Sequence, residues 1–159
     1  MNPKEEEAKN VEDETAIQNS SDIPEFLVNL NQAPLYLSEA QVKEISPSAL
    51  AYLGDAIYEL YVRMFFLWPK QRPEIYHRLV VAQVRAETQA LHLRSLTPHL
   101  RSYELDMIRR GRNAATGRPK RLNPEIYQQA TGLETLVGYL YLTDYPRLQE
   151  LLQKLHLEK

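Results

Sequence analysis

The chain has 159 residues and no cysteine, which excludes disulfide bonds, cysteine-ligated zinc and a thiol nucleophile. It also lacks an apolar run near the roughly 20 residues that a membrane-spanning helix needs. The longest candidate, from Ile57 to Trp68, contains Glu59 and Arg63. The N-terminus has no basic region followed by an apolar one, so we expect no secretory signal. We therefore expect a cytoplasmic protein with no membrane partner.

No segment alternates between apolar and polar residues with a period of two, as a half-buried strand would. Apolar residues recur instead at the spacing of helices, so we predict an all-α fold with about six helices. No internal repeat is present. The expected helices span about 38–43, 47–67, 73–95, 103–110 and 124–142, with a last one after Asp144.

Charge is spread unevenly along the chain. The formal net charge is −2, but residues 1–22 hold seven acids and two lysines and so carry −5, which leaves +3 on the remainder. The polar, acidic composition of residues 1–22 predicts a disordered tail. We expect residues 23–45 to form an irregular arm that packs on the core. Residues 46–159 are then one domain, long enough to bury a core of its own.

Two of the expected helices each carry one acid in an otherwise apolar stretch. Asp55 follows Gly54 in one helix, and Glu134 lies between Gly132 and Gly138 in the other. A glycine lets another backbone approach closely, so helices that cross at these glycines would bring the two carboxylates together. Neighbouring carboxylates raise each other's pKa, and a divalent cation such as Mg²⁺ removes that conflict. Alternatively, each acid pairs with an arginine or faces solvent.

A basic segment, residues 109–121, contains six cations and no acid. We expect a helix to end at Gly111 and a loop to follow over residues 111–122. Such a segment suits the phosphates of a nucleic-acid backbone, which dominate affinity without reading sequence. Alternatively, it is an ordinary solvated loop. Beside a cation site it favours phosphodiester hydrolysis. The residues expected to contact RNA are Arg109, Arg110, Arg112, Asn113, Arg118, Lys120 and Arg121.

Three motifs in this order resemble those of the ribonuclease III family. Residues 53–60, with Leu-Gly-Asp-Ala followed by Tyr-Glu-Leu, resemble the signature helix, and residues 133–142 resemble the second acidic motif. Residues 84–90 are similar to the helix between them. The resemblance covers about residues 44–156 and is nearest to Mini-ribonuclease III, the short branch that has a catalytic domain and no double-stranded-RNA-binding domain. It implies the helical fold of the ribonuclease III endonuclease domain.

The resemblance implies that Asp55 and Glu134 are the catalytic, Mg²⁺-binding residues. The larger family has two further glutamates before the Gly-Asp pair and an aspartate before the second glutamate. Here those positions hold Ser48, Ala51 and Thr131, which fits the short branch. Only two acids then remain in each site. We expect the scissile phosphate to supply oxygen ligands and the cation to bind weakly before RNA does.

The resemblance also implies a homodimer built on the signature helix, whose two sites cut the two strands of one RNA duplex. That helix carries more apolar residues than one small domain needs, namely Tyr52, Ile57, Tyr58, Tyr61, Val62, Phe65 and Phe66. All of these except Val62 and Phe66 are assigned to the dimer interface. The implied substrate is double-stranded RNA, in particular the precursor stem of large-subunit (23S) ribosomal RNA.

Other functions remain open at this point. The same fold could serve a non-catalytic RNA-binding or ribosome-assembly protein, or a helical dimerisation module whose basic loop is incidental. Glu74 and His77 form a Glu-x-x-His motif, which di-iron helical bundles use twice, but this chain has only one copy. Glu59 and Arg63 are expected to pair along one helix, because residues four apart are neighbours on a helix surface.

Overall fold

The computed structural model describes residues 37–117 and 120–157. Within these ranges it contains seven α-helices, one short 3-10 helix and no strand, which confirms the predicted all-α fold. The predicted tail and residues 23–36 of the predicted arm lie outside the described residues. None of the described helices is long and apolar enough to cross a membrane. The elements are α2 (Glu39–Lys43), α3 (Pro47–Leu67), α4 (Pro73–Val84), α5 (Ala86–Leu96), η2 (Thr97–His99), α6 (Ser102–Ala114), α7 (Pro124–Thr143) and α8 (Tyr145–Gln153).

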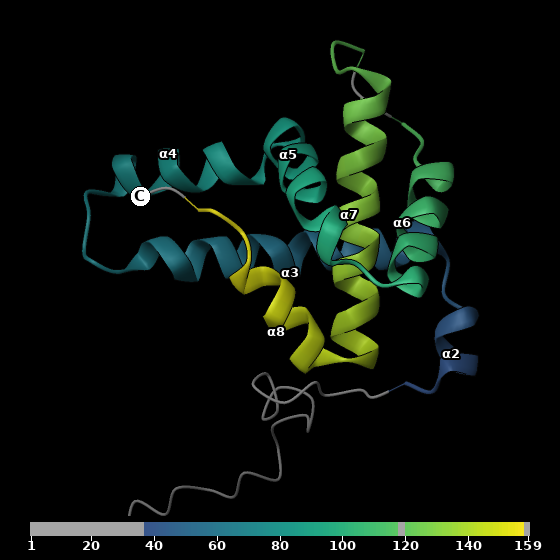
Figure 1. The fold of residues 1–159 in the computed structure, drawn as a ribbon. Coiled ribbons are helices and arrows are strands. Elements are labelled where there is room, and N and C mark those ends of the chain that lie inside the picture. Colours follow the sequence, from purple (N-terminus) through teal and green to yellow (C-terminus); the bar gives the residue numbers. More distant parts are fainter. Residues whose placement is uncertain (1–36, 118–119, 158–159) are drawn as a thin grey trace, which may run out of the picture.

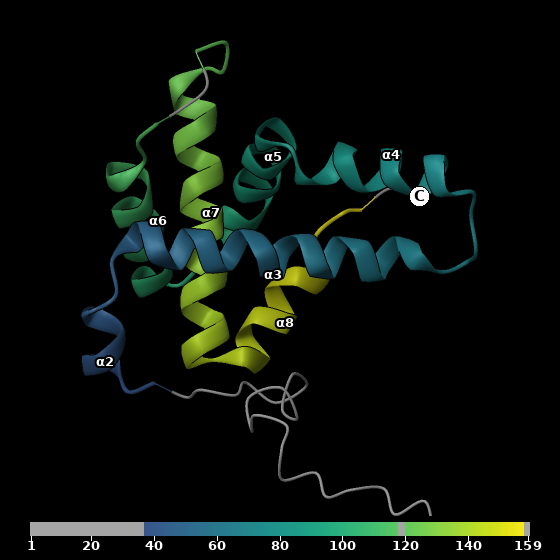
Figure 2. The same ribbon diagram turned by 180° about the vertical axis from the view of Figure 1, so that it is seen from behind.

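Helix α7 is the centre of the fold. Helices α5 and α6 lie along its upper half and α8 along its lower half (Figure 1). Helix α3 crosses α7 on the opposite side and continues beyond it, where α4 folds back alongside (Figure 2). Leu133, Leu136 and Leu140 of α7 are almost completely buried and belong to one cluster with residues of α3, α5, α6 and α8. The remaining helices therefore pack around α7.

The two long helices that carry the acids begin at the residues that the sequence predicts. The Ser46 hydroxyl accepts a hydrogen bond from the Ala49 backbone N–H at 3.2 Å, and Pro47 follows in the first helical position. Asn123 caps α7 in the same way, accepting from the Glu125 N–H at 2.8 Å, and Pro124 follows. A polar cap followed by proline suits a helix start, because proline has no N–H to leave unpaired there.

Two of the predicted helix boundaries are wrong. The stretch 73–95 is two helices, because Arg85 has an extended backbone with ψ 151° between α4 and α5. Helix α6 does not end at Gly111 but continues to Ala114. Gly111 is buried inside the helix, where an added Cβ would lie 2.2 Å from the Thr135 hydroxyl oxygen of α7. Here glycine permits close packing of two helices and does not terminate one.

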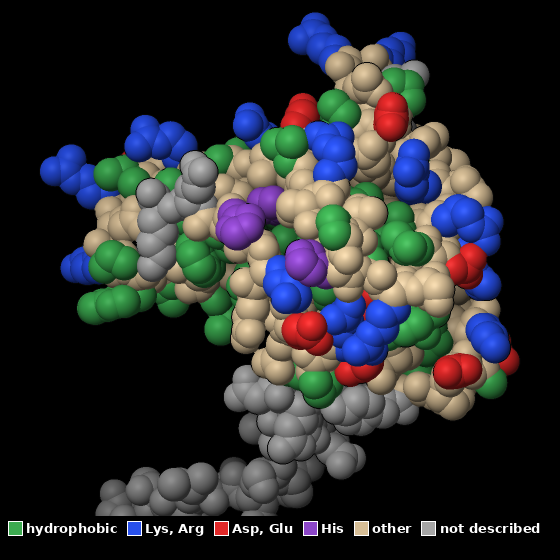
Figure 3. Space-filling model, viewed as in Figure 1, with side chains coloured by type: hydrophobic (Ala, Val, Ile, Leu, Met, Phe, Trp, Pro, Cys, Tyr) green, Lys and Arg blue, Asp and Glu red, His purple; other side chains and the backbone are tan. Residues whose placement is uncertain are grey.

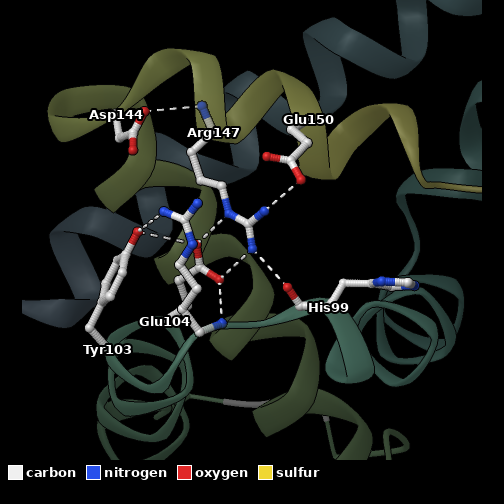
Figure 4. A network of polar contacts seen from close by, with 7 residues as sticks. His99, Tyr103, Glu104, Asp144, Arg147 and Glu150 are labelled. Carbon is white, nitrogen blue, oxygen red and sulfur yellow. Dashed lines mark hydrogen bonds and ion pairs between the residues drawn. The ribbon is translucent and has the colours of Figure 1, made fainter.

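A buried ion pair ties α8 to the start of α6 (Figure 4). The Arg147 side chain donates to Glu104 at 2.7 and 3.0 Å and to the His99 carbonyl at 2.7 Å. Glu104 also accepts from the Arg101 N–H at 2.8 Å. Both charged groups are buried, and both have several partners, as buried charges must. This network fixes the C-terminal helix on the helices around α7.

Candidate active site

The two acids lie at the place where α3 and α7 touch. A Cβ added to Gly54 would lie 1.7 Å from the Glu134 backbone oxygen, and one added to Gly138 would lie 2.1 Å from the Leu50 oxygen. The two helix backbones are therefore in contact through this pair of glycines. Gly132, the third glycine of the prediction, faces α6 instead, where its nearest neighbour is the Ile108 side chain. Sequence reasoning thus identified the crossing but assigned one glycine to it wrongly.

The two carboxyl groups have different environments. Asp55, expected on a buried helix, is exposed, whereas Glu134 is partly buried. Burial, and then the negative charge of Asp55, raises the pKa of Glu134 to about 7. Partial burial and the nearby Glu59 charge raise the pKa of Asp55 as well. The more deeply buried Glu134 feels the pair more strongly, so without a cation the shared proton resides on Glu134 while Asp55 is ionised.

A layer of buried polar groups lies beneath Glu134. Tyr58 is buried in the core, and its hydroxyl lies 2.7 Å from His92 Nδ1 and donates to the Gln83 carbonyl at 3.1 Å. Its pKa is raised by burial and then by the Glu134 charge, which places Tyr58 near the acid. Gln89 of α5 is also buried, and its side chain hydrogen-bonds Glu134. Sequence reasoning missed Gln89 and His92, since neither has a motif.

The acid pair fits a hydrated divalent cation bound by two protein carboxylates. No group of three or more His, Asp or Glu side chains that could hold a metal occurs in residues 37–117 and 120–157. Mg²⁺, however, is commonly bound through one or two carboxylates together with waters and substrate phosphates. Gln89 Oε1, buried beside Glu134, has no hydrogen-bond donor. A hydrated cation would bring both a positive charge for the acids and donors for such an acceptor.

The basic segment is mostly helix rather than loop, which corrects the prediction. Arg109, Arg110, Arg112 and Asn113 lie on the last turns of α6. Cations gather along this side of the molecule and at the α6–α7 connection (Figure 3). Tyr127 donates to the Thr116 carbonyl at 2.7 Å and thereby ties the connection to α7. The exposed residues Lys120 and Arg121 follow; Arg118 lies outside the described residues.

Asp106 reduces the charge of this basic surface. It forms ion pairs with Arg109 and Arg110, three and four residues further along α6. The sequence contained this signal, because residues at those spacings are neighbours on a helix. The analogous prediction for Glu59 and Arg63 is confirmed. The more exposed unpaired charge of the segment therefore lies towards Lys120 and Arg121.

The residues predicted for a dimer interface divide between two faces of α3. Tyr58 is 1% exposed inside the chain's own core, so its assignment is wrong, and Val62 and Phe66 are buried with it. Ile57, Tyr61 and Phe65 are partly buried and pack against the same core. Tyr52 is 86% exposed. It begins a row of exposed apolar side chains, the outer face of α3, which continues with Leu60, Met64, Leu67 and Trp68.

Two cavities lie elsewhere. One of about 550 Å³ lies between α2, α6 and the C-terminal half of α7 and is lined by neither Asp55 nor Glu134. The other, of about 330 Å³, lies beside the basic surface and is lined in part by Arg109, Arg112 and Asn113. A site that acts on a long polymer needs an open surface more than an enclosed pocket, so neither cavity moves the candidate site away from the acid pair.

Comparison with known proteins identifies the family. Residues 48–145 match the Ribonuclease III domain. A Mini-ribonuclease 3 from Synechocystis sp. is 59% identical over 116 residues, 73% of this chain and 81% of that protein. One from Synechococcus sp. is 60% identical over 119 residues, 75% and 86% of the two chains. A crystal structure of a Fusobacterium nucleatum protein superposes with a TM-score of 0.65 at 26% identity, covering 71% of this chain and 93% of that one. The chain therefore belongs to the ribonuclease III family, in its Mini-ribonuclease 3 branch, and is an endoribonuclease of double-stranded RNA.

Proposed function

We propose that Asp55 and Glu134 form the catalytic centre and that it works with Mg²⁺. The observation that carries this proposal is the contact of α3 and α7 through two glycines, which puts two carboxylates side by side and raises the pKa of Glu134 to about 7. A structural role would favour pairing each acid with a cation. The chain instead keeps a repulsive pair, as active sites often do.

The two acids have separate tasks in this proposal. Bound Mg²⁺ supplies a water of lowered pKa and a positive charge opposite the phosphate. Asp55 is exposed and ionised, so it meets the cation first. Glu134 must release its proton before it can bind, which makes occupancy depend on pH. Two carboxylates leave most coordination positions to water and to phosphate oxygens of the RNA.

The proposed substrate is a stem of double-stranded RNA, in particular the precursor stem of 23S ribosomal RNA. A-form RNA is recognised through its shape, phosphates and 2′-hydroxyls, which suits a basic surface without a base-reading element. The basic surface of α6 and the α6–α7 connection is the proposed grip. In a homodimer formed through the outer face of α3, the two acid pairs would cut the two strands of one duplex.

The deciding experiment is cleavage of a long RNA duplex with Mg²⁺, with and without chelator. We expect Asp55→Asn and Glu134→Gln to bind the duplex but not to cut it. The matched control is Glu125→Gln, which changes an acid of α7 in its first turn, away from the crossing. If both acid variants cut at the native rate, the catalytic assignment is wrong.

The same experiment separates the non-catalytic alternative. Native protein that binds but never cuts any duplex, including a precursor 23S stem, would favour a binding protein on this fold. Binding through phosphates should weaken steeply as salt rises. Lys120→Ala with Arg121→Ala should then flatten the salt dependence by about two contacts' worth of slope. An unchanged slope would place the grip elsewhere.

A further inference from the structure

We propose that Gln89 is a positioning residue for Glu134: its buried amide orients the carboxyl towards the cation, and its free oxygen accepts from a cation-bound water. The inference rests on the proposed function, because it assigns a partner to the same acid pair. It concerns a residue that contacts neither RNA nor the reacting phosphate and acts through Glu134.

The position of the Gln89 amide is fixed by its own contacts. The side chain is 1% exposed on α5, and Nε2 donates to the Val84 carbonyl at 3.2 Å. Val84 is the last residue of α4, next to the break at Arg85. Exchanging the amide oxygen and nitrogen would set two carbonyl oxygens against each other, so the contact determines which way the amide faces. The break between α4 and α5 thus anchors this side chain.

The second N–H of the amide is available to Glu134. A glutamine amide has two donors, and Val84 takes one of them. Helix α5 packs along α7, and Gln89 lowers the pKa of Glu134 by hydrogen bonding, against the effect of burial. Donation to a carboxylate favours its charged form, which is the form that binds a cation. Gln89 therefore promotes the state of Glu134 that the proposed reaction needs.

The remaining atom of the amide gives independent support. Gln89 Oε1 is buried and has no donor. The neighbouring polar groups cannot supply one, because the Tyr58 hydroxyl is already shared between His92 and the Gln83 carbonyl. Carboxylate and phosphate oxygens are acceptors as well. A water on a hydrated cation is a donor, and Mg²⁺ usually keeps several such waters.

The test compares Gln89→Met with Gln83→Met. Both changes remove an amide and nearly preserve volume, and Gln83 Oε1 is also buried and without a donor. No contact joins the Gln83 side chain to Glu134 within the described part of the chain, so it is the matched control. The readouts are Mn²⁺ binding by electron paramagnetic resonance, with and without an RNA duplex too short to cut, and the Mg²⁺ midpoint, kcat and KM for a long duplex.

For Gln89→Met we expect Mn²⁺ affinity to fall about 10- to 100-fold and the Mg²⁺ midpoint to rise by a similar factor, as for other partners of metal ligands. KM for the duplex at saturating Mg²⁺ should stay at the native value. Gln83→Met should leave all of these unchanged. Equal Mn²⁺ affinities for native protein and Gln89→Met, or equal losses in both variants, would overturn the assignment.

A second variant covers the case in which Gln89→Met does not fold. Gln89→Asn keeps the amide but withdraws it by one methylene, and it should show the same separation of Mg²⁺ midpoint from KM to a smaller degree. Native affinity in Gln89→Asn would then overturn the proposal. If native protein cuts no duplex, the proposed function fails, and Mn²⁺ binding alone decides the role of Gln89. Native protein that binds no Mn²⁺ even with duplex present overturns the role too.

Discussion

Gly54→Ala tests whether the helix crossing creates the active site. The added Cβ would lie 1.7 Å from the Glu134 oxygen, and acceptable contacts begin near 3.0 Å, so the helices must part locally by about 1.3 Å. Alanine gains about 1 kcal/mol over glycine in a helix. Overpacking of this kind typically costs about 1–3 kcal/mol, and here the contact is with backbone that cannot rotate away. We expect a net destabilisation of about 1–2 kcal/mol.

The effect on catalysis should exceed the effect on stability. A displacement of about 1 Å at a catalytic group can cost about 100-fold in rate, and here the displaced backbone carries Glu134 itself. Urea denaturation gives the free energy of unfolding, and duplex cleavage at saturating Mg²⁺ gives kcat. Both should be measured below the unfolding transition, so that loss of folded protein does not lower the rate.

Gly132→Ala provides the control on the same helix. Its Cβ would lie 2.9 Å from an Ile108 methyl group, the end of a side chain that can move. The helix-propensity gain should then roughly balance the crowding, with kcat close to native. Native stability and rate in Gly54→Ala, or an equal loss of rate in Gly132→Ala, would refute the argument that the backbone contact sets the acid pair.

Three further predictions follow from the charges and the surface. Arg147→Met should cost about 3–5 kcal/mol by leaving Glu104 buried without its cation, and an unfolding change below 1 kcal/mol would contradict this. Burial raises the pKa of Glu104, but hydrogen bonds from Arg147 and the Arg101 N–H outweigh it, so the folded-state pKa is lowered; the native pair should therefore stabilise above about pH 4.5 and lose that stability as pH falls, and Glu104→Gln should flatten this acid dependence in denaturation curves. Glu134 has a raised pKa of about 7, so its ionisation destabilises the fold as pH rises from about 4.5 to 7; without divalent cations Glu134→Gln should be more stable than native by about 1–3 kcal/mol at pH 8 and equal to it below pH 4, and no gain at pH 8 would show that the acid is not strained. Leu60→Lys on the outer face of α3 should produce monomers in sedimentation, whereas Leu91→Lys, at an equally exposed leucine of α5, should not; a native assembly state in both would move the interface elsewhere.

Local signals in the sequence predicted most of the fold. The pairs Ser46-Pro47 and Asn123-Pro124 begin the two acid-bearing helices because cap and proline act through neighbouring backbone atoms. The boundary errors came from residues whose effect depends on distant partners. Gly111 has the composition of a helix end but faces Thr135 across a helix contact, and Arg85 breaks a helix in an uninterrupted apolar pattern.

The sequence by itself determined the all-α class, the two acids and the glycines that let their helices meet, since these depend on residue type and spacing. Only the tertiary structure decided which face of α3 is buried, because that helix is apolar on every side and its periodicity does not distinguish the core from an outer surface. It placed Tyr58 inside and Leu60 outside. It also brought Gln89 to Glu134, because a neutral amide has no pattern in sequence and acquires its role only from what packs against it.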